Sequence, residues 1–305
     1  MKLKSAPQLT ANDFHQALTD VILPQDQVIV IYSAIWTFAG YFDYDIPKIP
    51  DLLLDIIEDV VGKNRTILFP TFCAAEFVKT RKYDLVRTQP KESGILSERA
   101  LLRKGFTRTQ TPLHSFAAKG PKASEVMGLP SATSWGPGSI LAWMGSANAR
   151  LCPLGLPWKK ACSYFHRIEE TLQVPYRYYK RFAGTLYHDG KEIGPCEEIK
   201  YSYSLRVPLD YDYSVVQNQL VERKKVISCK NPLILLESAL TSDVDIICRE
   251  IFENDLYAIV KNKEAVKHWV ETGREDEIAA LKPSERYLTG SQGKENDEGY
   301  IRTWD

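Results

Sequence analysis

Short apolar runs alternate with amphipathic segments through the first half of the chain. Residues 28–33 (VIVIYS), 66–70 (TILFP) and 149–155 (ARLCPLG) are apolar and have the length of buried strands. Between the first two, leucines and isoleucines recur at helical spacing in residues 49–64, and Gly62 marks the stop. Buried strands that alternate with helices are typical of a sheet covered on both faces. The pattern therefore predicts an α/β fold with a mostly parallel sheet.

The pattern changes after Leu172. Residues 197–207 (EEIKYSYSLRV) alternate as an exposed antiparallel strand does, and Asp189-Gly190 marks a hairpin before them. Helices are predicted near residues 211–224 and 241–254. We expect three parts: an α/β lobe at 1–172, a smaller α+β lobe packed on it at 173–282, and a polar C-terminal tail at 283–305.

The charge balance and the lengths of the apolar runs argue against several classes of function. The 305 residues carry 39 Lys plus Arg and 39 Asp plus Glu, so no net charge attracts nucleic acid or an acidic membrane in bulk. No secretory signal follows the first lysines, and the longest uncharged run, Gln27 to Phe42, is short for a membrane span. We therefore expect a cytoplasmic protein with neither nucleic-acid nor membrane partners, while a homo-oligomer stays open.

The six cysteines show no CxxC pair and no zinc-type spacing with histidine. Free cysteine behaves as a small buried hydrophobe. We expect reduced thiols and no bound metal.

A helix predicted over residues 159–172 (KKACSYFHRIEETL) carries the most interesting histidine. Ser163, His166 and Glu169 are spaced at i−3, i and i+3, which is one helix face. An imidazole is suited to general-base work at neutral pH, and a carboxylate can fix its tautomer. Alternatives stay open: an ordinary solvated helix face, orientation by Glu170 instead of Glu169, or a nucleophilic Cys162 activated by His166.

Taken in order, several segments are similar to motifs of one family. VIVIYSAIWTFAG matches a His-Ser/Thr-Ser-Leu loop with Ser33 kept but Tyr32 in place of the histidine, and TILFPTFC matches a Gly-Thr-Leu-(Met/Phe)-Pro-Thr strand. TQTPLHSFAAKG matches Ser-x-His-Pro-x-x-Ser-(Phe/Val)-Ala-Ala-x-Gly, with Thr111 replacing the histidine. LGLPWKKACSYFHRIEE resembles Leu-Gly-Val followed by Thr-x-x-His-x-x-Glu, and VPYRYYKR a later Pro-Tyr-Arg segment. From about Asp13 to Phe252 the chain thus resembles the aminoglycoside 3-N-acetyltransferase (antibiotic N-acetyltransferase) family.

This resemblance implies a three-layer α/β/α sandwich with a smaller α+β lobe, acetyl-CoA as donor and an amine as acceptor. It implies that His166 is the general base, that Ser163 lies near the thioester carbonyl, and that Glu169 orients the imidazole. The candidate CoA-binding residues are Ser33, Ala34, Thr71, His114 and Ser115.

The segment after the predicted catalytic helix bears on the acceptor. It is basic and aromatic, and no comparably dense acidic cluster precedes the tail; the candidate substrate-binding residues are Tyr176, Arg177, Lys180 and Arg181. Basic and aromatic groups suit a UDP- or dTDP-linked amino sugar of the kind used in polysaccharide biosynthesis, whereas aminoglycosides call for acidic groups. We therefore expect a nucleotide-linked amino sugar as acceptor.

Four alternatives stay open: an aminoglycoside-resistance enzyme, a Cys–His hydrolase, a non-catalytic ligand-binding relative, and a basic segment that only covers the surface or binds CoA phosphates.

Overall fold

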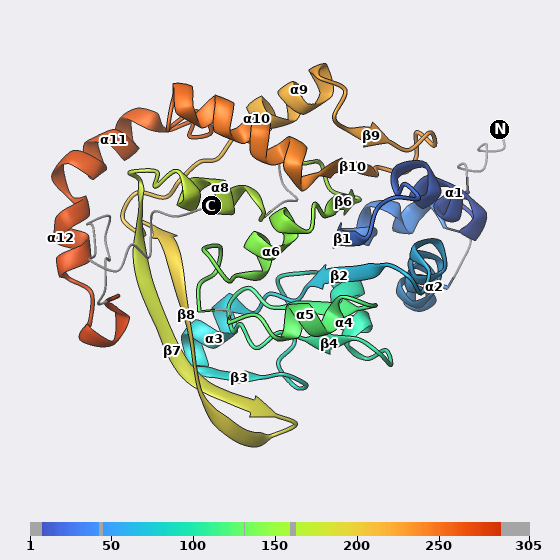
Figure 1. Ribbon diagram of the computed structural model, residues 1–305, viewed down its shortest axis with the longest axis horizontal. Coiled ribbons are helices and arrows are strands. Elements are labelled where there is room, and N and C mark those ends of the chain that lie inside the picture. Colours follow the sequence, from blue (N-terminus) through green and yellow to red (C-terminus); the bar gives the residue numbers. More distant parts are fainter. Residues whose placement is uncertain (1–7, 43–44, 131, 159–162, 288–305) are drawn as a thin grey trace, which may run out of the picture.

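The computed structural model of the chain describes residues 8–42, 45–130, 132–158 and 163–287. Within them, a central sheet has the strand order β4–β5–β2–β1–β6–β10–β9 (Figure 1). Its strands are β1 (Val28–Ser33), β2 (Thr66–Pro70), β4 (Thr107–Arg108), β5 (Phe116–Lys119), β6 (Arg150–Leu154), β9 (Ile227–Ser228) and β10 (Glu237–Leu240).

The expectation of a mostly parallel sheet is wrong. Among the described strands of this central sheet, only β1 pairs in parallel, with β2 on one side and β6 on the other. The outer pairs β2–β5, β4–β5, β6–β10 and β9–β10 are antiparallel. Strands such as β5 are apolar because both faces of the sheet are covered, and that burial does not specify their direction. The predicted mixed α/β fold itself is confirmed.

Helices cover both faces of this sheet, because alternate residues of β1 enter different cores. Ile29 and Ile31 pack with α1 and α2, whereas Val28, Val30 and Tyr32 pack toward α6, α8 and α10. The helices are α1 (Ala11–Val21), α2 (Ile49–Val61), α3 (Ala74–Thr80), α4 (Ile95–Leu101), α5 (Ala123–Met127), α6 (Ile140–Ser146), α8 (Phe165–Thr171), α9 (Ser214–Glu222), α10 (Thr241–Asn254), α11 (Lys263–Thr272) and α12 (Arg274–Ala279), with short 3₁₀ turns at Ile35–Tyr41, Ile46–Lys48 and Pro283–Glu285.

A second sheet is built on a long hairpin. β7 (Arg177–His188) and β8 (Lys191–Tyr203) pair antiparallel, and β3 (Lys82–Asp84) adds in parallel to β7. Figure 1 shows this hairpin in yellow, on the side of the molecule away from α1 and α2. The turn lies at Asp189–Gly190, as predicted, and both residues have positive φ.

One apolar core joins the two halves of the chain. It contains Leu151 of β6 and Ile168 of α8 together with Tyr176, Val216 and Phe252 from the second half. The boundary predicted at residue 172 therefore lies within a continuous core. Among the described residues, no helix combines the length and apolarity needed to traverse a bilayer.

Candidate functional site

Helix α8 presents a histidine and a glutamate that contact each other. His166 Nδ1 lies 2.5 Å from Glu169 Oε2, as the i, i+3 spacing allows. The Glu169 side chain is fully buried, and the His166 side chain keeps 25% of its surface exposed. Glu169 thus fixes the Nδ1 side of the imidazole, and part of the ring remains exposed to solvent. Within the predicted helix over 159–172, α8 covers Phe165–Thr171, and Ser163 lies in the turn that precedes it. Residues 159–162, including Cys162, lie outside the described residues.

Arg177, at the start of β7, completes this group. Its Nη2 lies 2.9 Å from Glu169 Oε2 and also donates to the Tyr211 hydroxyl, while Nη1 donates to the carbonyl of Tyr201 at 2.8 Å. The side chain is fully buried. Arg177, which we expected to bind substrate, therefore lies behind the imidazole and neutralises Glu169.

The hydrogen bonds assign the tautomer of His166. Arg177 Nη2 lies 3.0 Å from His166 Nδ1, but a guanidinium has no acceptor, and the carboxylate at 2.5 Å requires a proton on Nδ1. Nη2 therefore donates to Glu169, and Nδ1–H donates to the same carboxylate. The lone pair of the neutral imidazole is then on Nε2.

The charges of this group are fixed at neutral pH. Burial lowers the pKa of His166 to about 4, and the charge of Arg177 lowers it further, against the opposing effect of Glu169. Burial raises the pKa of Glu169, but Arg177 and His166 together bring it down to about 2. A neutral imidazole, an ionised carboxylate and a guanidinium follow, and this state is ready to accept a proton at Nε2.

Aromatic rings enclose the imidazole. The ring centre of Trp135 lies 4.8 Å from that of His166, and the centres of Tyr211 and Tyr213 lie 5.9 Å and 6.3 Å from it. The Arg177 guanidinium lies 4.9 Å from the Trp135 ring centre. These three aromatic residues were not predicted as site residues. The Tyr-x-Tyr pattern at 211–213 could have indicated two of them, but the same pattern is equally typical of the residues that begin a helix.

Ser163 contacts a residue at which the chain departs from the family pattern. Its hydroxyl lies 3.2 Å from the hydroxyl of Tyr32, at the end of β1. Tyr32 takes the motif's histidine position and is nearly buried. The departure therefore orients the hydroxyl three residues before the imidazole.

Glu170 does not take the place of Glu169. Its carboxyl group is buried on the other side of α8, where a Cβ atom at Gly136 would lie 2.6 Å from Glu170 Oε1. A side chain at position 136 would therefore force the Glu170 carboxyl group to move. Burial raises the pKa of Glu170 to about 8, although a hydrogen bond with Tyr179 opposes the increase. Glu170 is therefore mostly protonated at neutral pH, and it is Glu169 that contacts the imidazole.

This burial predicts a pH-dependent effect of Glu170→Gln on stability. The pKa is higher in the folded than in the unfolded state, so the folded state binds the extra proton and loses stability as the pH rises from about 4.5 to about 8. The glutamine variant lacks this loss. Relative to wild type, we expect its free energy of unfolding to rise by more than about 1 kcal/mol over that range, measured by urea denaturation. A difference that stays constant with pH would contradict this prediction.

Two of the expected CoA-binding residues line a cavity. Ser33 and Ala34, at the carboxyl end of β1, face a cavity of about 510 Å³ whose other walls come from the 3₁₀ turns, α2 and α4. The lining is mostly apolar, and Arg99 is its basic residue. Ser33 directly follows Tyr32, so its side chain points to the opposite face of the sheet from the Tyr32–Ser163 contact.

The other three expected CoA-binding residues lie deeper. Thr71 and Ser115 are fully buried and bonded to each other at 2.9 Å, and Arg108 donates to both hydroxyls. This triad links β2 to the start of β5. His114 lies next to it, with its Nδ1 2.8 Å from Glu198 Oε1.

The structure does not bring the expected substrate-binding residues together at one site. Tyr176 is fully buried in the core. Lys180 pairs with Glu285 at 3.2 Å, and Arg181 pairs with Glu197 at 2.5 Å. Along a β-strand successive side chains point to opposite faces. The basic run of the sequence therefore does not gather at His166.

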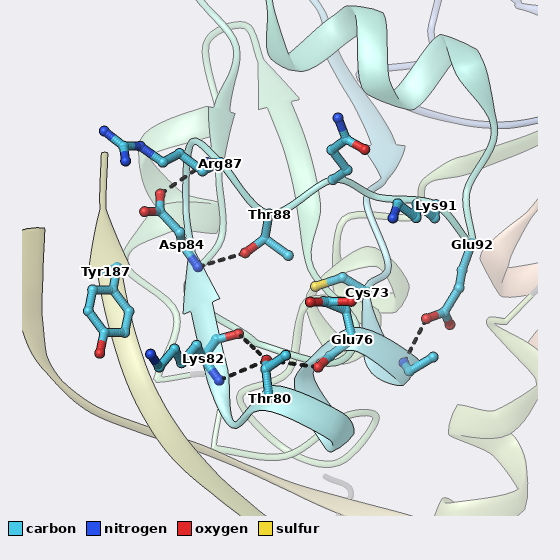
Figure 2. A pocket seen from close by; sticks show the side chains of 12 residues that line it. Cys73, Glu76, Thr80, Lys82, Asp84, Arg87, Thr88, Lys91, Glu92 and Tyr187 are labelled. Carbon is cyan, nitrogen blue, oxygen red and sulfur yellow. Dashed lines mark hydrogen bonds between the residues drawn. The ribbon is translucent and has the colours of Figure 1, made fainter. Parts of the chain in front are cut away.

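A second cavity, of about 520 Å³, lies between α3, β3 and residues 87–92. Figure 2 shows acidic and basic side chains around it, with Cys73 on its wall and Glu92 bonded to a backbone amide at the start of α3. Burial raises the pKa of Cys73 to about 12, so this thiol is not a nucleophile. Within the described part of the chain, no group of three or more His, Cys, Asp and Glu side chains is arranged to hold a metal ion.

Solved structures share this fold. Aminoglycoside acetyltransferase AAC(3)-IVa, as apoenzyme, is 16% identical with a TM-score of 0.67 over 86% of this chain and 95% of that chain. AAC-IIIb, in a binary complex with CoASH, is 18% identical with a TM-score of 0.66 over 81% of this chain and 97% of that one. The YokD protein from Bacillus subtilis is 15% identical with a TM-score of 0.65, over 82% and 95% of the two chains. At these identities the likeness establishes the fold.

The sequence places the chain in a family. A search of curated proteins found no match. The profile of the family described as aminoglycoside 3-N-acetyltransferase matches residues 44–236, well over half of the chain and including the whole His166–Glu169–Arg177 group. The chain belongs to the aminoglycoside 3-N-acetyltransferase family, and it is an N-acetyltransferase whose co-substrate is acetyl-CoA.

Proposed function

We propose that the protein transfers the acetyl group of acetyl-CoA to an amino group of an aminoglycoside-type amino sugar, with His166 as general base. The observation that carries this proposal is the Nδ1–H contact of His166 with buried Glu169, which leaves the lone pair on Nε2. Solved relatives support the acceptor class, since AAC(3)-IVa is described in complexes with a gentamicin and with apramycin, and AAC-VIa with sisomicin.

The chemistry is direct attack on the thioester. The acceptor nitrogen forms a bond with the carbonyl carbon, the carbon–sulfur bond breaks, the nitrogen loses a proton to His166 Nε2, and CoA leaves as a thiolate. A base placed in this way contributes about 10²- to 10⁴-fold to the rate. In this proposal the Ser163 hydroxyl, which contacts Tyr32, donates a hydrogen bond to the developing oxyanion.

We assign the CoA arm to the cavity at the end of β1. Its apolar walls suit the pantetheine chain, Ser33 offers a hydroxyl, and Arg99 offers a cation for a phosphate. The cavity and the Tyr32–Ser163 contact lie on opposite faces of the sheet at the carboxyl end of β1. In this proposal the thioester passes around that end of the strand to reach Ser163 and His166. Thr71 and Ser115 are buried between the end of β2 and the start of β5, and in this proposal their role is structural.

The test is CoA release from acetyl-CoA with mass spectrometry of the products, over a panel of aminoglycosides and nucleotide-linked amino sugars. We expect acetylation of at least one aminoglycoside. Absence of turnover with every amine, together with no thermal shift on adding CoA, would refute the proposal.

One observation favours a nucleotide-linked amino sugar as a second candidate acceptor. The Lys200 ammonium lies 5.6 Å from the Trp135 ring centre and 6.0 Å from that of Tyr203. No carboxylate among the described residues forms an ion pair with it, and burial and Arg177 lower its pKa to about 8. The carboxylates that act on it through space are Glu198, which is fully buried and bonded to His114, and Glu92. A cation without a counter-ion near the base suits an acceptor that carries a phosphate.

The variant Lys200→Met separates the two acceptors. If the acceptor carries a diphosphate, we expect its KM to rise at least about tenfold, because one charge-assisted contact is lost. The matched control is Lys180→Met, since Lys180 already has an ion-pair partner in Glu285. An unchanged or lower KM for aminoglycosides in Lys200→Met, without turnover of any nucleotide-linked sugar, would exclude the second candidate.

A further inference from the structure

A second histidine repeats the arrangement seen at His166. The Nδ1 atom of His114 lies 2.8 Å from Glu198 Oε1 and 3.1 Å from the Ser134 hydroxyl. The Ser134 hydroxyl also donates to Glu198 at 2.5 Å. The Glu198 side chain is fully buried, and its other oxygen accepts the backbone amides of Leu113 and His114 at 2.7 Å and 3.3 Å. Because Glu198 is the acceptor in each of these contacts, Nδ1 of His114 carries the proton and Nε2 carries the lone pair.

The two imidazoles share one indole ring. The ring centre of Trp135 lies 5.5 Å from that of His114 and 4.8 Å from that of His166. The Nδ1 side of each histidine is occupied by a buried glutamate, and none of the hydrogen bonds found in the described residues involves Nε2 of His114. Two imidazoles with the same pattern of hydrogen bonds therefore contact the same indole ring.

The charged groups around His114 keep it neutral. Burial lowers the pKa of His114, and Lys200 of β8 lowers it too, against opposing effects of Glu198 and of Glu92 in the loop before α4. Lys200 also acts on His166 in the same direction. Both imidazoles are therefore neutral at neutral pH, with Nε2 unprotonated.

The number of protons that leave the acceptor nitrogen in each turnover suggests a role for a second imidazole. A primary amine arrives at neutral pH mostly as an ammonium ion, R–NH₃⁺. The amide product R–NH–CO–CH₃ retains one of those three protons, so two leave the nitrogen in each turnover. One must leave before attack, to free the lone pair, and the other leaves as the carbon–nitrogen bond forms. The CoA thiolate takes up one proton, and the remaining one goes to solvent.

Resting on the proposed function, we propose that His114 is a second proton acceptor in the acetyl transfer. Its Nε2 takes, directly or through one water, the proton that the acceptor ammonium loses before attack, and His166 takes the proton lost during attack. The proton on His114 is then available to the departing CoA thiolate, and His166 releases its proton to solvent.

A purely structural role for His114 makes a different prediction. Its Nδ1–H holds Glu198, and Glu198 holds the backbone of residues 113–114, so the histidine could serve only to fix this loop. The variant His114→Asn separates the two roles, because an asparagine amide occupies the position of Nδ1–H and retains the bond to Glu198 but offers nothing at the position of Nε2. Glu198→Gln is the second variant, since it keeps an acceptor for the backbone amides and weakens the basicity of His114.

The experiment is the pH dependence of kcat/KM between about pH 6.5 and about pH 9.5 for wild type, His114→Asn and Glu198→Gln, with melting temperatures as a check on folding. We expect His114→Asn to be at least about tenfold slower at pH 7 and to approach wild type near pH 9.5, where the amine arrives already deprotonated. Glu198→Gln should show a smaller deficit that closes in the same way.

The outcomes distinguish this proposal from the proposed function. Activity of His114→Asn equal to wild type at every pH, or a deficit that is the same at every pH, would overturn the second-base role while leaving His166 as the base. Absence of turnover in the wild type with any amine would overturn the proposed function and this inference with it.

Discussion

The variant His166→Asn is expected to lower kcat by about 10²- to 10⁴-fold, the usual contribution of a general base. Asparagine keeps an N–H group where Nδ1–H donates to Glu169 and removes the lone pair of Nε2. The carboxylate therefore stays satisfied, and we expect the KM for acetyl-CoA and the melting temperature to change little. Steady-state kinetics and thermal unfolding measure these quantities.

The control for this variant is His268→Asn, on an exposed position of α11, which should behave as wild type. Raising the pH should not rescue His166→Asn, because the proton lost during attack must leave even when the amine arrives neutral. Retention of more than about a tenth of wild-type kcat would remove His166 from the role of base.

The second large effect is expected from Arg177→Met. Both Arg177 and Glu169 are fully buried, and removal of one partner of a buried ion pair leaves the other charge uncompensated. Such a loss typically costs about 3–5 kcal/mol, and we expect the free energy of unfolding to fall by that amount in urea denaturation.

The double variant Glu169→Gln/Arg177→Met provides the control. It removes both charges, so it should recover a large part of the lost stability while remaining almost inactive, because His166 loses its partner. The single variant should also raise the pKa of His166, since Arg177 is one cause of its low value. A single variant within about 1 kcal/mol of wild type would show that the pair is not needed for the fold.

The local parts of this site were predictable. His166 and Glu169 are three residues apart, and helical geometry alone brings such residues together. The apolar runs that became β1, β2 and β6 were equally clear, because burial on both faces leaves an unbroken apolar pattern. Family motifs added the assignment of His166 as the base, which spacing alone left open.

The remaining parts depended on strand pairing. Glu198 and Lys200 lie on a strand that was predicted to be exposed, since polar residues alternate with apolar ones there. In the structure that polar face is covered by the loop carrying Ser134 and Trp135 and by His114, so Glu198 is fully buried. A pattern of alternation shows which residues share a face and does not show what covers that face.

By itself, the sequence determined the elements built from near neighbours: the buried strands, the hairpin turn, and the histidine and glutamate on one helix face. Only the tertiary structure decided the strand directions, the burial of Arg177 behind Glu169, and the meeting of His114 with Glu198, 84 residues later in the chain. The physical reason is that local spacing fixes contacts within a helix or turn, whereas contacts between distant segments follow from how the whole chain closes around its cores.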